Sequence, residues 1–119
     1  KISKASYIVT QEHGTEAPFS GELLDTKEEG IFTCVCCGNE LFSSDTKYDS
    51  GTGWPSFWDV LNENSVGEEI DKSHGMIRTE VHCQKCNAHL GHLFPDGPMP
   101  TGKRYCMNSV AMQFKKSDK

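Results

Sequence analysis

The sequence predicts a mainly β protein with one short helix. Four runs are either rich in β-branched and aromatic residues or alternate between apolar and polar residues, which is typical of strands: 30–34, 40–42, 76–83 and 108–114. Segments rich in Gly, Pro or acidic residues separate these runs and are typical of loops. A chain of 119 residues has room for one core of ordinary size, so we expect a single domain over residues 1–119.

The N-terminal segment has the pattern of a short helix. Ser3 is a suitable N-cap for a helix over Ser3–Glu12. Ala5, Ile8 and Val9 would then lie roughly along one side of it.

Two longer segments are expected to be loops. The segment 49–58 (DSGTGWPSFW) is rich in Gly, although it carries aromatic residues that a polar loop would leave exposed. The segment 62–73 (NENSVGEEIDKS) is acidic and polar, and we expect it to be solvated.

The charge balance argues against a nucleic-acid-binding protein. The chain has 12 Lys and Arg against 17 Asp and Glu, a formal charge of −5, whereas nucleic-acid modules normally carry a basic surface. No apolar run approaches the roughly 20 residues that span a bilayer, so we expect no membrane association. The N-terminal residues resemble neither a signal peptide nor a transit peptide. The first residue is Lys and not Met, which is compatible with the removal of a leader.

The six cysteines comprise two matched pairs and two single residues. Cys34 with Cys37, and Cys83 with Cys86, have the C-x-x-C spacing that directs two thiolates of one turn at the same ion, and a Gly or Asn that suits an unusual backbone follows each pair. Four sulfur ligands fill a tetrahedral Zn²⁺ site, so one structural zinc is expected. Such pairs are more typical of metal sites in a reducing compartment than of disulfides, and we expect a cytoplasmic protein. Two disulfides or free thiols are the alternative, and Cys36 is a competing ligand.

Cys106 lies outside these pairs and has neighbours suited to thiol chemistry. A lone cysteine is by default a small buried hydrophobe. A nucleophilic thiol needs a lowered pKa, which a nearby His or Arg supplies, and His89 and His92 directly follow the second cysteine pair. An aromatic pocket suits a methyl–sulfur group, and a donor suits a polarised S=O oxygen; Trp54 and Asn108 offer these groups.

Each of these residues also has a simpler interpretation. His89 and His92 could form a second metal site, although no carboxylate stands at ligand spacing beside them. Asn108 could be a turn residue at the start of a strand, and Trp54 could be an ordinary core residue.

Five ordered motifs give the chain a family resemblance. They are G-W-P-S-F, C-x-x-C, H-L-G-H-x-F, D-G-P and R-Y-C-x-N. In this order they resemble the B-type methionine sulfoxide reductases, which act on the R epimer; one enzyme type serves each sulfoxide epimer. The resemblance extends from about residue 7 to residue 114, nearly the whole chain.

The resemblance implies both a fold and a set of site residues. The implied fold is a β-tent of two antiparallel sheets with a short N-terminal helix, and with the four-cysteine zinc clip on the side away from the active site. Cys106 would be the nucleophile, and Trp54 and Phe94 would face the substrate methyl group. Three further residues would bind and protonate the sulfoxide oxygen: His89, His92 and Asn108.

The chain departs from the commoner pattern of this family at one position. Many members have cysteine in the loop S-G-C-G-W-P-S-F and use it to resolve the oxidised nucleophile, whereas this chain has Thr52. Reduction would leave Cys106 as a sulfenic acid, which we expect an external thioredoxin-like reductant or a small dithiol to reduce. Cys36 is expected to lie too far away for a disulfide, which needs Cα atoms within about 7 Å.

The resemblance implies oxidised proteins or methionine sulfoxide as the substrate, and we expect a monomer. Two other functions compete with this one. A non-enzymatic zinc-binding β-tent module would bind RNA or a protein, and related β-tent proteins show that the fold alone does not prove catalysis. A binding module has no need to combine Cys106 with His89, His92 and Asn108, which favours an enzyme. A hydrolase with a Cys–His pair ranks last, because no segment resembles an acyl-enzyme oxyanion loop.

Overall fold

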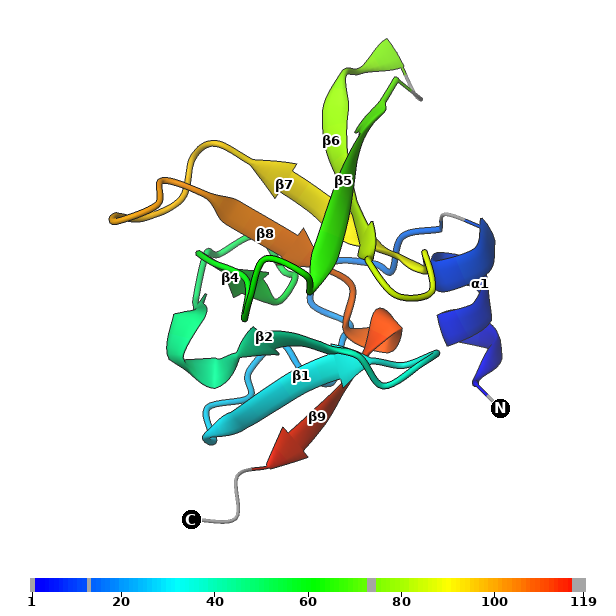
Figure 1. The fold of residues 1–119 in the computed structure, drawn as a ribbon, viewed down its shortest axis with the longest axis horizontal. Helices are drawn as coiled ribbons and strands as arrows, with labels where there is room; N and C mark the ends of the chain where they lie inside the picture. Colours follow the sequence, from blue (N-terminus) through cyan, green and yellow to red (C-terminus); the bar gives the residue numbers. More distant parts are fainter. Residues whose placement is uncertain (1, 13, 73–74, 117–119) are drawn as a thin grey trace.

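Two antiparallel sheets, one α-helix and short 3₁₀ turns such as Ser44–Thr46 make up the regular structure of residues 2–12, 14–72 and 75–116, the part of the chain that the computed structural model describes (Figure 1). The smaller sheet has the strand order β2-β1-β9, and the larger sheet has the order β3-β4-β8-β7-β6-β5. The bounds are α1 Lys4–Glu12, β1 Gly30–Cys34, β2 Glu40–Ser43, β3 Lys47–Tyr48, β4 Ser56–Phe57, β5 Val66–Asp71, β6 Arg78–Cys83, β7 His89–Phe94, β8 Arg104–Met107 and β9 Met112–Lys116. The expected β-tent, with a short N-terminal helix and four clustered cysteines, is confirmed.

Aromatic rings join the two sheets. Phe32 of β1 and Phe42 of β2 both contact Phe57 of β4, with ring centroids 5.0 and 4.3 Å apart. The ring of Phe42 also lies 5.6 Å from that of Tyr105 in β8, and all four side chains are buried. Each such ring removes about 150–250 Å² from water, which holds the small sheet against the large one. Because side chains alternate along a strand, Cys106 faces away from this core.

The polar edge strand of the larger sheet contradicts the expectation that residues 62–73 form a loop. The acidic segment 62–73, expected to be a loop, contains β5, which pairs with β6 along its whole length. β5 is an edge strand, and all of its residues are half-buried or exposed. Such a strand lacks the apolar alternation by which strands are recognised in a sequence.

The expected strand at 108–114 is confirmed only over residues 112–114, which belong to β9. β8 ends at Met107, a 3₁₀ turn covers Ser109–Ala111, and β9 begins at Met112 in the other sheet. The turn therefore carries the chain from the large sheet to the small one. The Gly-rich segment 49–58 likewise ends in a short strand, β4. The other three expected strands are confirmed as β1, β2 and β6, with shifts of no more than two residues.

Helix α1 is confirmed, but its buried side is more polar than expected. The Oγ of Ser3 accepts a hydrogen bond from the backbone N–H of Ser6 at 3.1 Å, as an N-cap does. Ala5 and Ile8 are exposed, and the buried residues are Ser6, Val9 and Thr10. The hydroxyl of Ser6 donates to the carbonyl of Val110 at 2.5 Å, so a hydrogen bond helps to dock the helix on the 3₁₀ turn.

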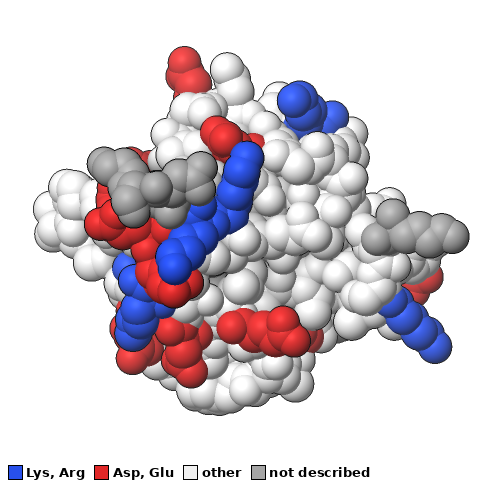
Figure 2. All heavy atoms as spheres, turned by 90° about the horizontal axis from the view of Figure 1, so that it is seen from below, with Lys and Arg blue, Asp and Glu red and all other residues white. Residues whose placement is uncertain are grey.

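The surface shown in Figure 2 carries charges of both signs. Lys and Arg side chains lie among Asp and Glu side chains on this face and form no continuous basic surface there. Such a face is unlike the basic footprint of nucleic-acid modules. Within the described ranges, no helix is both long and apolar enough to span a membrane.

Candidate active site and metal centre

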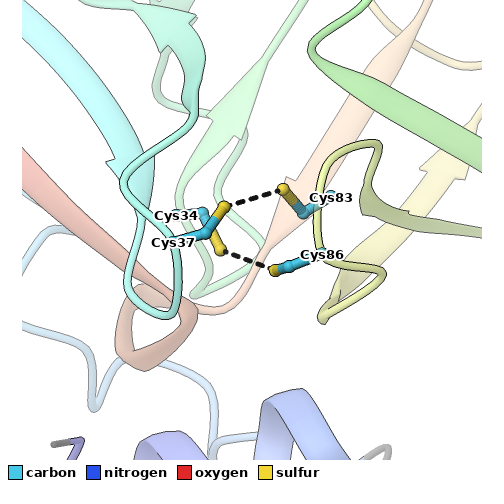
Figure 3. A group of neighbouring side chains, drawn as sticks. All are labelled: Cys34, Cys37, Cys83 and Cys86. Atoms are coloured by element: carbon cyan, nitrogen blue, oxygen red, sulfur yellow. Dashed lines mark hydrogen bonds between the residues drawn. The ribbon is translucent and has the colours of Figure 1, made fainter.

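Four cysteines form a cluster between the β1–β2 turn and the β6–β7 turn (Figure 3). Their sulfur atoms all lie within 4.8 Å of one another, and the contacts of Cys34 with Cys86 and of Cys37 with Cys83 are both 3.6 Å. Four sulfurs bound at about 2.3 Å to a tetrahedral ion would lie roughly 3.8 Å apart. The four expected ligands are thus brought together in a geometry that fits a metal ion.

The two turns that carry these cysteines are built alike. The N–H of Gly38 donates to the carbonyl of Cys34 at 2.9 Å, and that of Asn87 donates to the carbonyl of Cys83 at 2.8 Å. Gly38 and Asn87 have φ angles of 80° and 66°, in the left-handed region that Gly and Asn tolerate best. The expected unusual backbone after each pair is therefore present.

The chemistry of the sulfur atoms also suits a cation. Burial raises the pKa of the Cys34 thiol, and it raises the pKa of Cys86 to about 11. Four neighbouring thiolates at neutral pH therefore need a bound positive charge. A set of four sulfur donors favours an ion such as Zn²⁺ over Mg²⁺ or Ca²⁺.

Cys36 belongs to the first turn but not to the cluster. Its Sγ lies 3.5 Å from Thr10 Oγ1 and 3.5 Å from Gln11 Nε2, both in α1, and the residue is exposed. Cys36 is neither in the four-sulfur group nor among the residues that line the cavity around Cys106.

Cys106 lies in the middle of the larger sheet. Its Cα pairs with that of Ser56 in β4 on one side and with that of His92 in β7 on the other. Residues directly opposite each other in antiparallel strands point to the same face. Ser56, Cys106 and His92 therefore form a row on the face away from the aromatic core.

A small cavity of about 270 Å³ opens at Cys106. It lies just below the range of roughly 300–1,000 Å³ for small-molecule sites, so it suits one side chain better than an extended ligand. Its lining consists of Thr15, Thr52, Trp54, Phe94, Arg104, Cys106 and Asn108. Four of the six expected functional residues meet in this cavity: Cys106, Trp54, Phe94 and Asn108.

The surroundings of Cys106 correct the expectation of a lowered pKa. Burial raises the pKa of its thiol and outweighs the opposing effects of Thr52, Arg104 and Ser56. Thr52 Oγ1 lies 3.7 Å from the sulfur. A chain of hydroxyls continues from there, since Ser50 Oγ lies 2.8 Å from Thr52 Oγ1 and 2.7 Å from Ser56 Oγ. Burial therefore opposes formation of the thiolate, whereas the hydrogen-bonding neighbours favour it.

The main chain of Glu16 fixes two of the cavity residues. Its carbonyl accepts the indole N–H of Trp54 at 3.0 Å, and its N–H donates to Asn108 Oδ1 at 2.9 Å. Asn108 Nδ2 donates to the carbonyl of Leu90 at 3.0 Å. A side-chain amide has a second N–H, which is the group of Asn108 that a ligand oxygen would engage.

His89 and His92 come together because β7 contains an irregularity. Residues three apart in a regular strand point to opposite faces, but the pairing of β6 with β7 has a register shift, and the two ring centroids lie 5.4 Å apart. His89 Nδ1 lies 2.9 Å from Glu80 Oε2, and His92 Nε2 lies 2.8 Å from Asp71 Oδ2.

Neither imidazole lines the cavity. Within the described residues, the four cysteines are the only group of this kind that could hold a metal ion, so the structure does not support a second metal site at the histidines.

Arg104 holds the aromatic wall of the cavity. Its guanidinium carbon lies 4.3 Å from the ring centroid of Phe94, a cation–π geometry. Its Nε and Nη2 donate to the two carboxylate oxygens of Asp96 at 2.7 and 3.1 Å. Because Arg104 lies two residues before Cys106, its side chain is on the same face of the sheet and its charge favours the thiolate.

Thr15 and Arg104 line the cavity but are not among the sequence-predicted site residues. The two-residue spacing of Arg104 from Cys106 is a signal that could have identified it. Thr15 carries no such signal, because its position follows from the hydrogen bonds of Glu16 to residues far away in the sequence.

Together, the fold and the site define a small β protein with a four-cysteine metal-type cluster and a separate thiol at an aromatic cavity, the layout of a thiol enzyme. The chain belongs to the SelR domain family, which matches residues 2–116. A peptide methionine sulfoxide reductase MsrB of Hahella chejuensis is 56% identical over 118 residues, which is 99% of this chain and 85% of the relative. One from Thioalkalivibrio sulfidiphilus is 53% identical over 119 residues, 100% of this chain and 87% of the relative.

A solved structure shares the fold at low sequence identity. The crystal structure of the Mis18 'Yippee-like' domain has a TM-score of 0.61 and 20% identity, and covers 77% of this chain and 100% of that domain. This likeness concerns the fold alone. The resemblance to the B-type reductases is confirmed by the family match and by the relatives.

Proposed function

We propose that this protein reduces methionine (R)-sulfoxide, mainly in proteins, to methionine, with Cys106 as the nucleophile. The observation that carries the proposal is the position of Cys106 in a small cavity with Trp54 and Phe94, in a chain of the SelR family. The aromatic rings suit the methyl group of the substrate, and the relatives are named for this activity. These relatives, and a thiol at a cavity, favour an enzyme over the alternative, a non-enzymatic zinc-binding module.

The proposed reaction is a net exchange of one oxygen between substrate and enzyme. The sulfur of Cys106 attacks the sulfoxide sulfur and forms an S–S bond, while the S–O bond breaks and the oxygen is protonated and leaves as water. A water then attacks the Cys106 sulfur, breaks the S–S bond and releases the thioether. The substrate sulfur is reduced by two electrons to the thioether, and Cys106 is oxidised by two electrons to the sulfenic acid. Burial raises the pKa of this thiol in the free protein, so the attack depends on the groups that favour the thiolate, the Thr52 and Ser56 hydroxyls and the charge of Arg104.

We assign the handling of the sulfoxide oxygen to three residues: His92, His89 and Asn108. His92 is the cross-strand neighbour of Cys106, and its hydrogen bond to Asp71 orients the imidazole. His89 is oriented in the same way by Glu80. Since neither ring lines the cavity of the free protein, contact with the oxygen would form when substrate binds, as catalytic hydrogen bonds often do.

We propose that an external thiol donor such as thioredoxin regenerates the enzyme. Two thiols of the donor would reduce the sulfenic acid to Cys106 thiol and water and become a disulfide. Thr52, beside the sulfur, offers a hydroxyl and no second thiol, and Cys36 contacts α1 instead. One structural Zn²⁺ at the cysteine cluster, a monomeric state and a cytoplasmic location complete the proposal.

Turnover of the separated R and S epimers of dabsylated methionine sulfoxide, with dithiothreitol and then with thioredoxin, tests this function. We expect the R epimer to be preferred by at least about 100-fold, because an aromatic wall that accepts a methyl group leaves an oxygen without a partner. Cys106→Ser should abolish turnover and leave the metal content unchanged, whereas Cys36→Ser should retain turnover. Equal rates on the two epimers would refute the pocket assignment, and activity in Cys106→Ser would refute the nucleophile.

A further inference from the structure

Phe19 stands exposed in an unfavourable backbone conformation. Its φ is 64°, and 69% of the residue's surface is accessible. A bulky residue in the left-handed region is a rare outlier that persists only where the surrounding structure imposes it, and such outliers cluster at functional sites. The backbone N–H of Phe19 donates to the carbonyl of Gly53 at 2.6 Å, which helps to impose it here.

This ring lies against the loop that forms one side of the cavity. A Cβ placed on Gly53 would come within 2.8 Å of the Phe19 ring, so the ring rests directly on this glycine. Gly53 stands between Thr52 and Trp54, both of which line the cavity. Thr15, four residues before Phe19, lines it as well.

The segment that carries Phe19 is firmly held. Glu16 bonds through its main chain to the side chains of Trp54 and Asn108, and its Oε1 accepts the backbone N–H of Val110 at 3.1 Å. A side chain presented from such a segment loses little conformational freedom when it binds a partner.

We propose that Phe19 binds an apolar side chain next to the oxidised methionine in a flexible segment of a protein substrate. The inference rests on the proposed function and specifies its substrate class. The cavity suits a single side chain, so the polypeptide on either side of the methionine stays outside it and crosses the rim. The exposed ring offers that polypeptide an apolar surface beside Gly53, the residue before Trp54. Free methionine sulfoxide has no neighbouring residue and cannot make this contact.

The test compares three R-sulfoxide substrates: N-acetyl-methionine sulfoxide and two blocked tripeptides, with Leu or with Ser on both sides of the oxidised methionine. For the wild-type protein, kcat/KM for the Leu tripeptide should exceed that of the other two about tenfold, a common effect of one apolar contact at an enzyme site. Phe19→Asn removes the ring, and Asn tolerates a positive φ, so this variant should lose the preference. Phe19→Gly should lose it equally. Ile77→Asn is the matched control and should keep the preference for the Leu tripeptide. Ile77 is 77% exposed and belongs to the β5–β6 hairpin, which projects from the body of the molecule (Figure 1).

The outcomes separate this inference from the proposed function. If the wild-type protein reduced none of the three substrates, the proposed function itself would fail. If it reduced all three but Phe19→Asn kept the tenfold preference for the Leu tripeptide, only the role of Phe19 would be overturned. The alternative occupant of the Phe19 ring is a second copy of the chain, and sedimentation velocity tests it. A wild-type dimer that becomes a monomer in Phe19→Asn would show that the ring lies in a dimer interface and would overturn its role in substrate binding.

Discussion

Replacing Thr52 by Val should raise the pKa of the Cys106 thiol. The hydroxyl of Thr52 lies 3.7 Å from the sulfur and is the first of the contacts that lower this pKa against the effect of burial. A hydrogen bond to a charged group contributes about 1.5–3 kcal/mol at good geometry. At this distance we take the lower end, about 1.5 kcal/mol, which corresponds to about one pKa unit. Because the lost bond favours the thiolate, the shift is upward.

The pH dependence of iodoacetamide alkylation measures this shift. A Cys36→Ser background leaves Cys106 as the cysteine outside the metal cluster, and mass spectrometry identifies the modified residue. Below the pKa, the thiolate fraction and hence the alkylation rate should fall about tenfold in Thr52→Val. Thr52→Ser keeps the hydroxyl and should behave as the wild type does. An unchanged pKa in Thr52→Val, with an unchanged melting temperature, would show that Thr52 does not tune the nucleophile.

Three further predictions follow from the site. Elemental analysis should find one zinc ion per chain, and Cys86→Ser should be metal-free with a lower melting temperature. Less than about a third of an equivalent of zinc in the folded wild-type protein would contradict the metal site. His92→Ala should lower kcat by about 10²- to 10⁴-fold, the usual range for a general acid. Asp71→Asn should lower kcat less, because the His92 ring keeps a neutral hydrogen-bond partner. A wild-type kcat in His92→Ala would rule out His92 as the general acid. After one turnover without reductant, dimedone should label Cys106 in the wild type, whereas Thr52→Cys should form a disulfide with Cys106 and block labelling; a disulfide in the wild type would disprove external regeneration.

Local sequence alone was sufficient to predict the metal cluster. Each C-x-x-C pair and the Gly or Asn after it make a tight turn whose geometry depends on a few consecutive residues, and Gly38 and Asn87 have the expected left-handed backbone. The strands β1, β2 and β6 could be predicted for a similar reason, because they contribute to the core and carry its apolar pattern.

The errors in the fold arise where the local pattern is weak or misleading. β5 pairs at a polar edge, so its strand character comes from the hydrogen bonds of β6 and not from its own residues. The run after Cys106 has the composition of one strand, but the chain changes sheets at Ser109–Ala111, and only the packing of the two sheets decides that.

The sequence by itself determined the types of side chain at the site: a thiol, two imidazoles, an amide and aromatic rings in an ordered set of motifs. The tertiary structure decided how they meet. The register shift in β7 brings His89 and His92 together, and the main chain of Glu16 orients Trp54 and Asn108 from a distant part of the chain. Burial by the assembled fold raises the pKa of Cys106, an effect that no short motif reveals, because desolvation depends on everything that surrounds the sulfur.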